Sequence, residues 1–540
     1  MTYMRIVRFI PSALCAFCLI AHLDARGADG SIFERHAYKD IYVALSTGND
    51  AGTGGAQSPF ASIQRGIDEL YRINAAGYPS RLVIRPGVYR ASVYMTNTPA
   101  RNDLPIIIEA IGAVMISGAD IWNNGWQREN GVYRKPWPYA WSVLGKPSGW
   151  ETVKMKDIVR RSEMVIVNGR PLLQASAMPA RDDTFFIDDT AGMICLRTKA
   201  DPNGTHDVIE VAVRPLNRGD RLMLFKNISN LLVRGLTVTH ARNASFPEMA
   251  CGFLGMTNLV VERCTFVQNN WGGMNTGADS SAVTIRGCGF ISNGITGGAI
   301  SGASNVLVEG LCAEYNNWRG IRGGFWGWGI AGNKSVRLRD AQFRNCSFSS
   351  NQTFGLWFDV YCHSIMVESS RIRGNRFSTE TIEDGGYGLN FELSIGLVVS
   401  NCIIADQSTG LLSEGASNMV FIDSVFSNHT HQHMLFPMKM REQGNTGEAW
   451  WPSAMSTSGL SLFKNRIGYS RARIINVFVK DEKEHRNAGH FIADYHGDEN
   501  EFYAPKNSGF TFLENGRSTN AGLSDWQRTS GQDKRSINRE

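Results

Sequence analysis

Three short segments share one pattern and read Gly355-Leu-Trp-Phe-Asp359, Gly388-Leu-Asn-Phe-Glu392 and Gly410-Leu-Leu-Ser-Glu414. Apolar residues at alternate positions predict that each segment is a short β-strand. Successive side chains of a strand point to opposite faces, so each final acid lies on the face opposite the apolar side chains. Parallel strands stack about 4.8 Å apart, and stacking would bring Asp359, Glu392 and Glu414 into one outward column. Carboxylates at that spacing repel one another, so at least one pKa should rise.

A repeat through the chain supports the stacking. Seven anchor positions follow one another at intervals of 22 to 34 residues: Cys264, Cys288, Cys312, Cys346, Ser370, Cys402 and Ser424. A large apolar residue stands two positions after most anchors, with Glu314 as the exception. Five positions after the first five anchors stand Asn269, Asn293, Asn317, Asn351 and Asn375. Columns at fixed offsets indicate a solenoid, and short β-branched segments predict a parallel β-helix with an asparagine ladder at one turn.

The cysteines of the anchor column are expected to be free thiols. An even number of cysteines in an exported protein favours disulfides. Serine replaces cysteine at two anchors, however, which indicates a small buried position, and neighbouring stacked strands rarely meet disulfide geometry. No cysteine or histidine spacing indicates a zinc site.

Composition and the N-terminus bear on location and partners. The formal net charge of +5 over 540 residues is too weak to indicate a nucleic-acid partner. Residues 1–28 read as a signal peptide, with Arg5 and Arg8 before the apolar run Phe9–Ile20. That run is too short to span a membrane, and no later segment spans one. We therefore expect a secreted or periplasmic protein, and a monomer.

The chain divides into five regions. After the signal peptide, residues 29–120 begin the β-helix, with a capping helix at 59–73 that covers its open apolar end. Residues 121–214 break the repeat and read as a small inserted β-rich domain. Residues 215–430 hold the regular coils, and residues 431–540 hold irregular C-terminal coils and a second cap.

Motifs at both ends of the chain resemble a family. The beginning contains Tyr42-Val43, Gly48-Asn49-Asp50, Pro59-Phe60-Ala61-Ser62-Ile63-Gln64 and Pro86-Gly87-Val88-Tyr89, and the end contains Leu523-Ser-Asp-Trp526-Gln527 with Gly531-Gln532-Asp533. They are similar to those of secreted right-handed parallel β-helix repeat proteins. Together with the insertion, the chain resembles β-helix glycoside hydrolases of the xylosidase and fucosidase type that carry an inserted β-sandwich. The expected fold is an all-β, right-handed parallel β-helix.

The acid column favours a retaining glycoside hydrolase acting on a polysaccharide or oligosaccharide. Retaining enzymes hold two carboxyl groups about 5–5.5 Å apart, close to one strand spacing. The family resemblance implies Asp359 as nucleophile and Glu392 as acid/base. Glu414 is a third catalytic candidate that would tune a pKa or bind a hydroxyl. The hydrolase needs no cofactor.

Two alternatives remain open on the same residues. Three carboxylates could bind calcium at Asp359, Glu392 and Glu414, as in a Ca²⁺-dependent lyase or epimerase on uronates. Arg319, Arg322, Lys439 and Arg441 would then be available bases or charge partners. The non-enzymatic alternative is a glycan-binding or scaffolding solenoid, whose acids are solvated surface residues.

A glycine-rich aromatic loop before the acids is the candidate sugar wall. It carries Trp318, Arg319, Arg322, Trp326 and Trp328, and flat aromatic faces suit the C–H faces of pyranoses. Packing of the loop against the solenoid is the alternative. Further substrate-binding candidates are Trp357, Asn390 and His363. Finally, His429, His431 and His433 would share one strand face, which suits a metal ion or a loop with one functional member.

Overall fold

The computed structural model describes residues 27–539 with the exception of 142, 216–220, 244–248, 443–451, 453, 469–471, 480–481, 504–509 and 515–516. The predicted signal peptide lies almost entirely outside the described residues. No helix among the described residues is long and apolar enough to cross a membrane.

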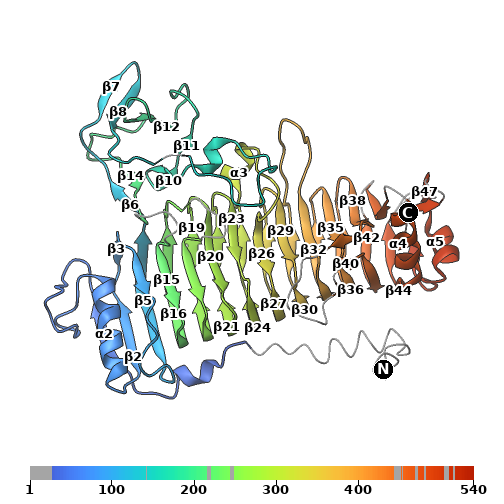
Figure 1. Ribbon diagram of the computed structural model, residues 1–540, viewed down its shortest axis with the longest axis horizontal. Coiled ribbons are helices and arrows are strands. Elements are labelled where there is room, and N and C mark those ends of the chain that lie inside the picture. The colour runs from blue at the N-terminus through green and yellow to red at the C-terminus, as the bar shows by residue number, and fades with distance from the viewer. Residues whose placement is uncertain are drawn as a thin grey trace.

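The chain winds into a long parallel β-helix built from two sheets (Figure 1). A typical coil contributes β29 (Phe354–Asp359) to one sheet, then β30 (His363–Glu368) and β31 (Arg371–Arg373) to the other. Each strand pairs in parallel with its counterpart in the next coil. The predicted fold is confirmed.

Among the described residues, the sheet that carries the acids has 13 strands. Besides β29 they are β4 (Val93–Met95), β15 (Met223–Lys226), β17 (Cys251–Leu254), β20 (Gly272–Gly277), β23 (Thr296–Ala299), β26 (Ala331–Val336), β32 (Tyr387–Glu392), β35 (Thr409–Glu414), β38 (Gln432–Pro437), β43 (Arg473–Phe478), β46 (Phe510–Glu514) and β47 (Arg517–Ala521). We call it the acid sheet.

The second sheet, again among the described residues, has 24 strands. Besides β30 and β31 they are β1 (Lys39–Val43), β2 (Ser80–Ile84), β3 (Gly87–Tyr89), β5 (Ile106–Ser117), β16 (Ser229–Thr239), β18 (Thr257–Glu262), β19 (Thr265–Val267), β21 (Ser280–Arg286), β22 (Gly289–Ile291), β24 (Ala303–Glu309), β25 (Cys312–Glu314), β27 (Leu338–Arg344), β28 (Ser347–Ser349), β33 (Ile395–Ser400), β34 (Ile403–Ala405), β36 (Ser417–Ile422), β37 (Val425–Ser427), β41 (Ser458–Phe463), β42 (Arg466–Gly468), β44 (His496–Asp498), β45 (Glu501–Tyr503) and β48 (Ile537–Asn538).

An amide ladder runs inside one turn of the solenoid. Each side-chain amide donates to the carbonyl oxygen of the next, in the order Asn269, Asn293, Asn316, Asn351 and Asn375. A glycine stands beside the amides of Asn293, Asn316, Asn351 and Asn375, because a side chain would not fit there. A Cβ at Gly355, for example, would lie 2.6 Å from Nδ2 of Asn375. The glycine that opens each acid segment therefore makes room for the ladder.

One coil differs from the predicted alignment by a single residue. Gly289 pairs with Cys312, so the anchor of that coil is Leu311. Leu311 is fully buried, whereas Cys312 is exposed. The same shift places Asn316 in the ladder instead of Asn317, and buried Ala313 in the large apolar column instead of Glu314. The coil is one residue shorter than assumed.

The described cysteines are free thiols, as expected. Cys264, Cys288, Cys346 and Cys402 are buried in the anchor column and direct their thiols at main-chain carbonyl oxygens. Burial raises the pKa of Cys264 to about 12, so the thiolate is disfavoured. These cysteines are small core residues.

Helices close both ends of the solenoid (Figure 1). α2 (Ile63–Ala75) buries Ile63, Ile67 and Leu70 against the first coils, and Ser62 caps it by accepting from the amide of Arg65. A short 3-10 helix, η1 (Gly30–Phe33), precedes it. α4 (Glu482–Ala493) and α5 (Leu523–Ser530) lie at the far end.

The C-terminal motif is explained by Asp533. Its fully buried carboxylate accepts from the Tyr495 hydroxyl, the Trp526 indole and the Asn500 amide. Asn500 also accepts from Asn465, so Asp533 terminates a second amide ladder.

The insertion forms two small sheets above the first coils (Figure 1). Their strands are β6 (Ala119–Ile121), β7 (Gln127–Glu129), β8 (Val132–Pro136), β9 (Val165–Val167), β10 (Arg170–Pro171), β11 (Leu173–Gln174), β12 (Thr184–Asp188), β13 (Met193–Arg197) and β14 (Ile209–Ala212). A separate core that includes Val165, Phe185 and Leu196 holds them together. The segment around the 3-10 helix η2 (Asp157–Arg160) leaves this unit and lies along the solenoid.

A column of alternating charge follows the outer face of the 24-stranded sheet. Paired positions on successive strands are Glu109, Arg234, Glu262, Arg286, Glu309, Arg344 and Glu368. Arg286 and Glu309 form an ion pair of 3.0 Å. We call it the charge column.

Candidate active site

The three acids lie in one column on consecutive strands. Trp357 pairs with Asn390 and Phe358 with Phe391, so the next positions, Asp359 and Glu392, are neighbours. Glu392 in turn pairs with Glu414. The strand spacing brings neighbouring carboxyl groups to within about 5 Å of one another, depending on their rotamers. The prediction that Asp359 and Glu392 occupy adjacent strands is confirmed.

The acids are recessed in the outer face of the acid sheet. Leu356, Phe358, Leu389 and Phe391 point into the core and are fully buried. The side chains of Asp359, Glu392 and Glu414 are only 14%, 15% and 23% exposed. Glu109 and Glu262 of the charge column are 11% and 22% exposed, so the two columns are shielded from solvent to a similar extent.

Asp359 is held by the preceding coil. Nζ of Lys334 lies 2.7 Å from Oδ2 of Asp359 and 3.6 Å from the centre of the Trp357 ring. The main-chain amide of Val360 donates to Oδ1 of Asp359 at 2.8 Å. Both carboxylate oxygens therefore have a donor, which fixes the orientation of the group.

Glu392 and Glu414 share one cation. Nη1 of Arg441 lies 2.7 Å from Oε1 of Glu392 and 2.8 Å from Oε1 of Glu414. Burial and the charge of Asp359 raise the pKa of Glu392 to about 6, although Arg441 and Lys334 both act to lower it. The rise predicted for at least one carboxyl pKa occurs at Glu392. The main causes of this rise are burial and the charge of Asp359. Arg441 lies between Glu392 and Glu414.

Two polar atoms beside the acids have no partner among the described residues. Nε1 of Trp357 and Oδ1 of Asn390 are buried, and neither forms a hydrogen bond with that part of the chain. Trp357 packs outside the main core with Phe354 and Ala331. Unpartnered buried polar groups are costly unless a ligand or water satisfies them. Trp357 and Asn390 thus remain good substrate-binding candidates.

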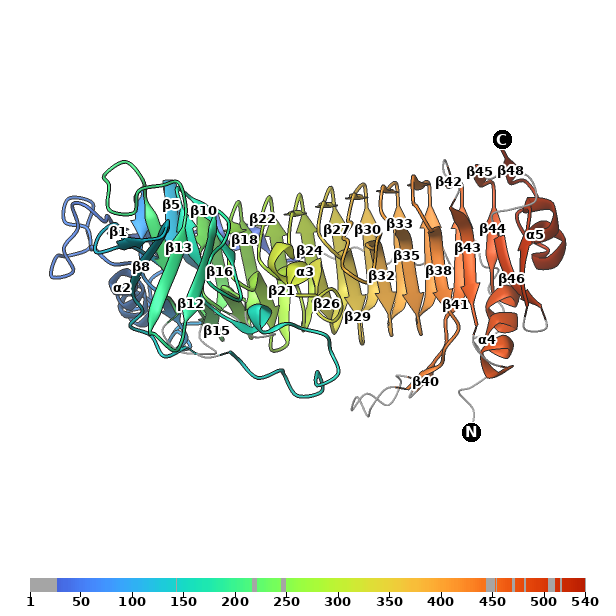
Figure 2. The same cartoon turned by 90° about the horizontal axis from the view of Figure 1, so that it is seen from above.

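Walls flank the acid column on two sides. Trp150 of the insertion contacts Phe325 and Trp328, with ring centres 5.8 and 5.6 Å apart. The same cluster includes Ala299, which lies on the outer face of the acid sheet. On the other side, Arg441 belongs to the hairpin of β39 (Arg441–Glu442) and β40 (Ala454–Met455). In Figure 2 the insertion segment and the β40 hairpin project from the same side of the solenoid, with β29, β32 and β35 between them.

The members of the predicted sugar wall have different positions. Trp328 is 50% exposed in the cluster with Trp150. Trp326 stacks on Phe377, and Trp318 donates its indole N–H to the carbonyl of Ser292. The predicted contact of Arg319 with substrate does not fit the structure. It is 5% exposed on α3 (Trp318–Arg322).

The guanidinium of Arg319 instead fastens the insertion to the solenoid. It donates to the carbonyl oxygens of Ile158 and Arg161 and to Oε1 of Gln174. Arg322, at the end of α3, is exposed beside Trp326. His363 lies on β30, in the sheet that does not carry the acids.

The histidine run does not present one face. His429 and His433 are buried, and their Nδ1 atoms lie 2.6 Å apart. His431 lies outside and shares a hydrogen bond with the hydroxyl of Ser408. Within the described part of the chain, no group of three or more His, Cys, Asp or Glu side chains is arranged to hold a metal ion. The metal interpretation of the run is not supported.

The acid column fits calcium poorly. Asp359 is paired with Lys334, and Glu392 and Glu414 are paired with Arg441. A Ca²⁺ ion, which takes six to eight oxygen ligands, would have to displace both cationic side chains.

Lys334 is the site residue that the sequence interpretation did not include. The glycines beside the ladder asparagines identify the position of Lys334. Gly332 lies beside Asn351 in the same way as Gly355 lies beside Asn375. Aligning these glycines places Lys334 opposite Trp357.

Comparisons with known proteins agree with this architecture. A family model described as a right-handed β-helix region matches residues 325–440. No curated protein sequence matches the chain. A solved complex of XylC with xylose has 15% sequence identity and a TM-score of 0.61, over 86% of this chain and 84% of that one.

Two further solved structures are more distant. The GH136 lacto-N-biosidase from Eubacterium ramulus has 11% identity and a TM-score of 0.47, over 86% of this chain and 68% of that one. The A-module of the Azotobacter vinelandii mannuronan C-5 epimerase AlgE4 has 14% identity and a TM-score of 0.45, over 81% and 95%. The protein is a right-handed parallel β-helix protein. The likeness to XylC is one of fold.

Proposed function

We propose that the protein is an exported carbohydrate-active enzyme, and specifically a retaining glycoside hydrolase that acts on a polysaccharide or oligosaccharide. The observation that carries the proposal is the pairing of Glu392, whose pKa is raised to about 6, with Asp359, which is ion-paired to Lys334 on the neighbouring side. Retaining hydrolysis needs a protonated acid next to an ionised nucleophile.

The residues divide the reaction between them. Asp359 attacks the anomeric carbon while Glu392 donates its proton to the departing glycosidic oxygen, which leaves a glycosyl ester on Asp359. Glu392, now ionised, takes a proton from water, and the resulting hydroxide displaces Asp359 from the sugar. Lys334 orients Asp359, and Arg441 keeps Glu392 and Glu414 in place.

The surroundings suit a saccharide. Trp357 offers a buried indole N–H and Asn390 an amide oxygen, neither with a partner among the described residues, and both can bond sugar hydroxyls. Trp328 offers an exposed aromatic face at the wall. The similar fold of XylC holds xylose, which supports a saccharide as ligand. Unpartnered polar atoms beside the acids favour an enzyme over a scaffold.

The test is digestion of a glycan panel by the purified protein and by the Asp359→Ala and Glu392→Ala variants. We expect reducing sugar from at least one neutral or acidic glycan, loss of turnover in both variants, and unchanged thermal unfolding. Azide should restore turnover to Asp359→Ala as a glycosyl azide, because it can attack from the vacated side. Wild-type turnover in both variants would overturn the proposal.

A Ca²⁺-dependent lyase or epimerase on uronates is the competing candidate, since the basic groups of Lys334 and Arg441 stand among the acids. A lyase leaves a new carbon–carbon double bond, which absorbs in the ultraviolet. Such products, together with loss of activity in EDTA and its return with Ca²⁺, would decide for this candidate.

A further inference from the structure

A pocket lies where three segments of the chain meet. It has a volume of about 480 Å³ and is lined by residues 154–156 of the insertion, by 321–324 and Trp326 at and after the end of α3, and by 378–381 of the loop between β31 and β32. Pockets of this size commonly hold small ligands. Two of the three lining segments precede β26, which carries Lys334, and β32, which carries Glu392.

The pocket walls are firmly joined. The amide of Lys156 donates to the carbonyl of Gly323 at 2.9 Å. Gly323 packs so closely on buried Val159 that an added Cβ would lie 1.9 Å from a methyl group. On the opposite wall, Phe377 and Gly385 exchange two main-chain hydrogen bonds at the base of the loop. The pocket is therefore a built feature of the fold.

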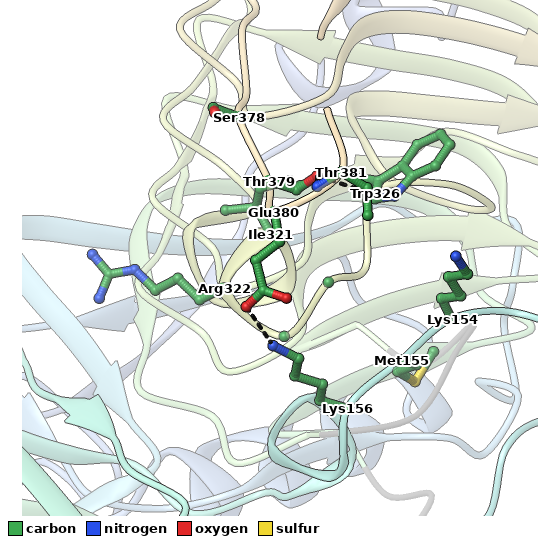
Figure 3. A pocket seen from close by; sticks show the side chains of 12 residues that line it. Lys154, Met155, Lys156, Ile321, Arg322, Trp326, Ser378, Thr379, Glu380 and Thr381 are labelled. Carbon is green, nitrogen blue, oxygen red and sulfur yellow. Dashed lines mark hydrogen bonds and ion pairs between the residues drawn. The ribbon is translucent and has the colours of Figure 1, made fainter. Parts of the chain in front are cut away.

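Cations dominate the lining. Lys154, Lys156 and Arg322 line the pocket together with one carboxylate, that of Glu380. Within the described residues, neither Lys154 nor Arg322 has an acidic partner within ion-pair distance. Burial and the nearby charge of Arg181 lower the pKa of Arg322 from its ordinary value. Figure 3 shows Glu380 in the middle, with Arg322 on one side and Lys154 and Trp326 on the other.

The one ion pair in the pocket is weak. Nζ of Lys156 lies 3.4 Å from Oε1 of Glu380, and the two side chains are 61% and 87% exposed. Exposed pairs of this kind contribute little to stability. An anionic ligand can therefore replace Glu380 at Lys156 without a large cost. Trp326, supported by Phe377 at 5.8 Å and 20° between ring planes, supplies a flat apolar surface.

We infer that this pocket binds an anionic sugar unit, so that the substrate is a glycan bearing carboxylate or sulfate groups. That the bound glycan is also a substrate rests on the proposed function. The binding itself does not depend on catalysis. Lysine and arginine supply charge-assisted hydrogen bonds to carboxylate or sulfate oxygens, and the indole packs against the sugar ring. Glu380 occupies the anion position in the free protein.

The experiment measures binding of polygalacturonate, dextran sulfate and neutral dextran to the Asp359→Ala protein, which cannot turn them over if the proposed function holds. We expect at least one anionic polymer to bind more tightly than dextran. If only polygalacturonate binds, the recognised group is a carboxylate. If only dextran sulfate binds, it is a sulfate. Lys156→Ser and Arg322→Ser should each weaken that binding about tenfold, the loss of one charge-assisted contact.

Two matched variants sharpen the test. Glu380→Gln removes the competing carboxylate and should tighten anionic binding about threefold, whereas a merely structural role for the loop predicts weakening. Lys199→Ser, an exposed lysine elsewhere on the insertion, should change nothing. Equal binding of dextran, or anionic binding that survives both cation variants, would overturn the inference. Pocket-dependent binding without any hydrolysis by the wild type would overturn the proposed function alone.

Discussion

The ammonium group of Lys334 lies 2.7 Å from Oδ2 of Asp359, one coil further along the solenoid. The two side chains are only 10% and 14% exposed, so water screens their interaction weakly. Lys334 is thus placed to orient Asp359 and to influence the titration of Glu392 on the next coil.

Replacing Lys334 with Met should slow the reaction and shift its pH dependence. Asp359 loses its orienting partner, which we expect to lower kcat/KM roughly 10- to 100-fold. Lys334 lowers the pKa of Glu392, so its removal should raise that pKa above the present value of about 6. Because Glu392 must be protonated, the alkaline limb of the pH profile of kcat/KM should move to higher pH. Lys334→Arg is the control that keeps the charge, and an unmoved limb in Lys334→Met would contradict the assignment.

Substitutions of Arg441 and of Glu414 should affect the alkaline limb of the pH profile of kcat/KM differently. Arg441 lowers the pKa of Glu392, so Arg441→Met should move the alkaline limb upward. Arg441 lies between Glu414 and Glu392 and balances the charge of Glu414, so Glu414→Gln should move the limb less than Arg441→Met does and should reduce kcat only mildly. Steady-state pH profiles of the two variants provide the comparison. A large upward or downward shift in Glu414→Gln would show that the two glutamates titrate together.

Acid should destabilise the protein through the buried histidine pair. Burial lowers the pKa of His433 to about 3 and that of His429 well below its ordinary value. Unfolded histidine binds a proton near pH 6.5, so the stabilisation is complete above that pH and is lost as pH falls from 6.5 toward 3. The slope is about 1.4 kcal/mol per pH unit for each histidine.

Denaturant titrations between pH 7 and pH 4 measure this loss. His429→Gln keeps an amide in the ladder column, as Gln407 does one coil earlier, and should remove one histidine's share of the slope. The exposed His490→Gln serves as control and should leave the slope unchanged. An identical slope in the wild type and His429→Gln would refute the prediction.

The ladder prediction separates two adjacent asparagines. Asn316 donates to Oδ1 of Asn351 and to the carbonyl of Phe290, both at 2.8 Å. Asn316→Ala should therefore lower the free energy of unfolding by about 2–3 kcal/mol, since buried partners lose their bonds. Asn317 is in a left-handed conformation and makes longer bonds of 3.2 and 3.4 Å. Asn317→Gly should cost less than 1 kcal/mol by the same principle. If chemical denaturation showed that Asn317→Gly costs more stability than Asn316→Ala, the repeat alignment with Asn317 in the ladder would be correct.

The sequence allowed most of the coil pattern to be predicted, because burial imposes a fixed register on each strand. The inward Leu356 and Phe358 and the outward Asp359 follow from strand alternation alone. The one-residue shortening at Leu311 could not be seen, since Cys312 is as small as the other anchors and hid the change. The contacts between Arg319 and the insertion could not be predicted either, because they depend on where the insertion folds back over the solenoid.

The candidate site was predictable for the acids and not for their cations. Acids on consecutive strands are fixed by the repeat, whereas Arg441 reaches them from a hairpin outside it. Spacing in the sequence gives no information on the direction of such a hairpin. The raised pKa of Glu392 was expected from neighbouring charge, but its first cause is burial, which requires the walls.

The charge column restricts how this solenoid can change its length. Glu and Arg alternate from Glu109 to Glu368, so removing the single coil of Glu262 would place Arg234 beside Arg286. Like charges on directly opposed strand positions destabilise a sheet by roughly 0.2–1 kcal/mol per pair. Removing or duplicating two coils together would keep every opposite-charge contact. Over this part of the molecule, insertions and deletions that preserve the column must therefore come in pairs of coils, so the natural unit of growth is twice the structural repeat.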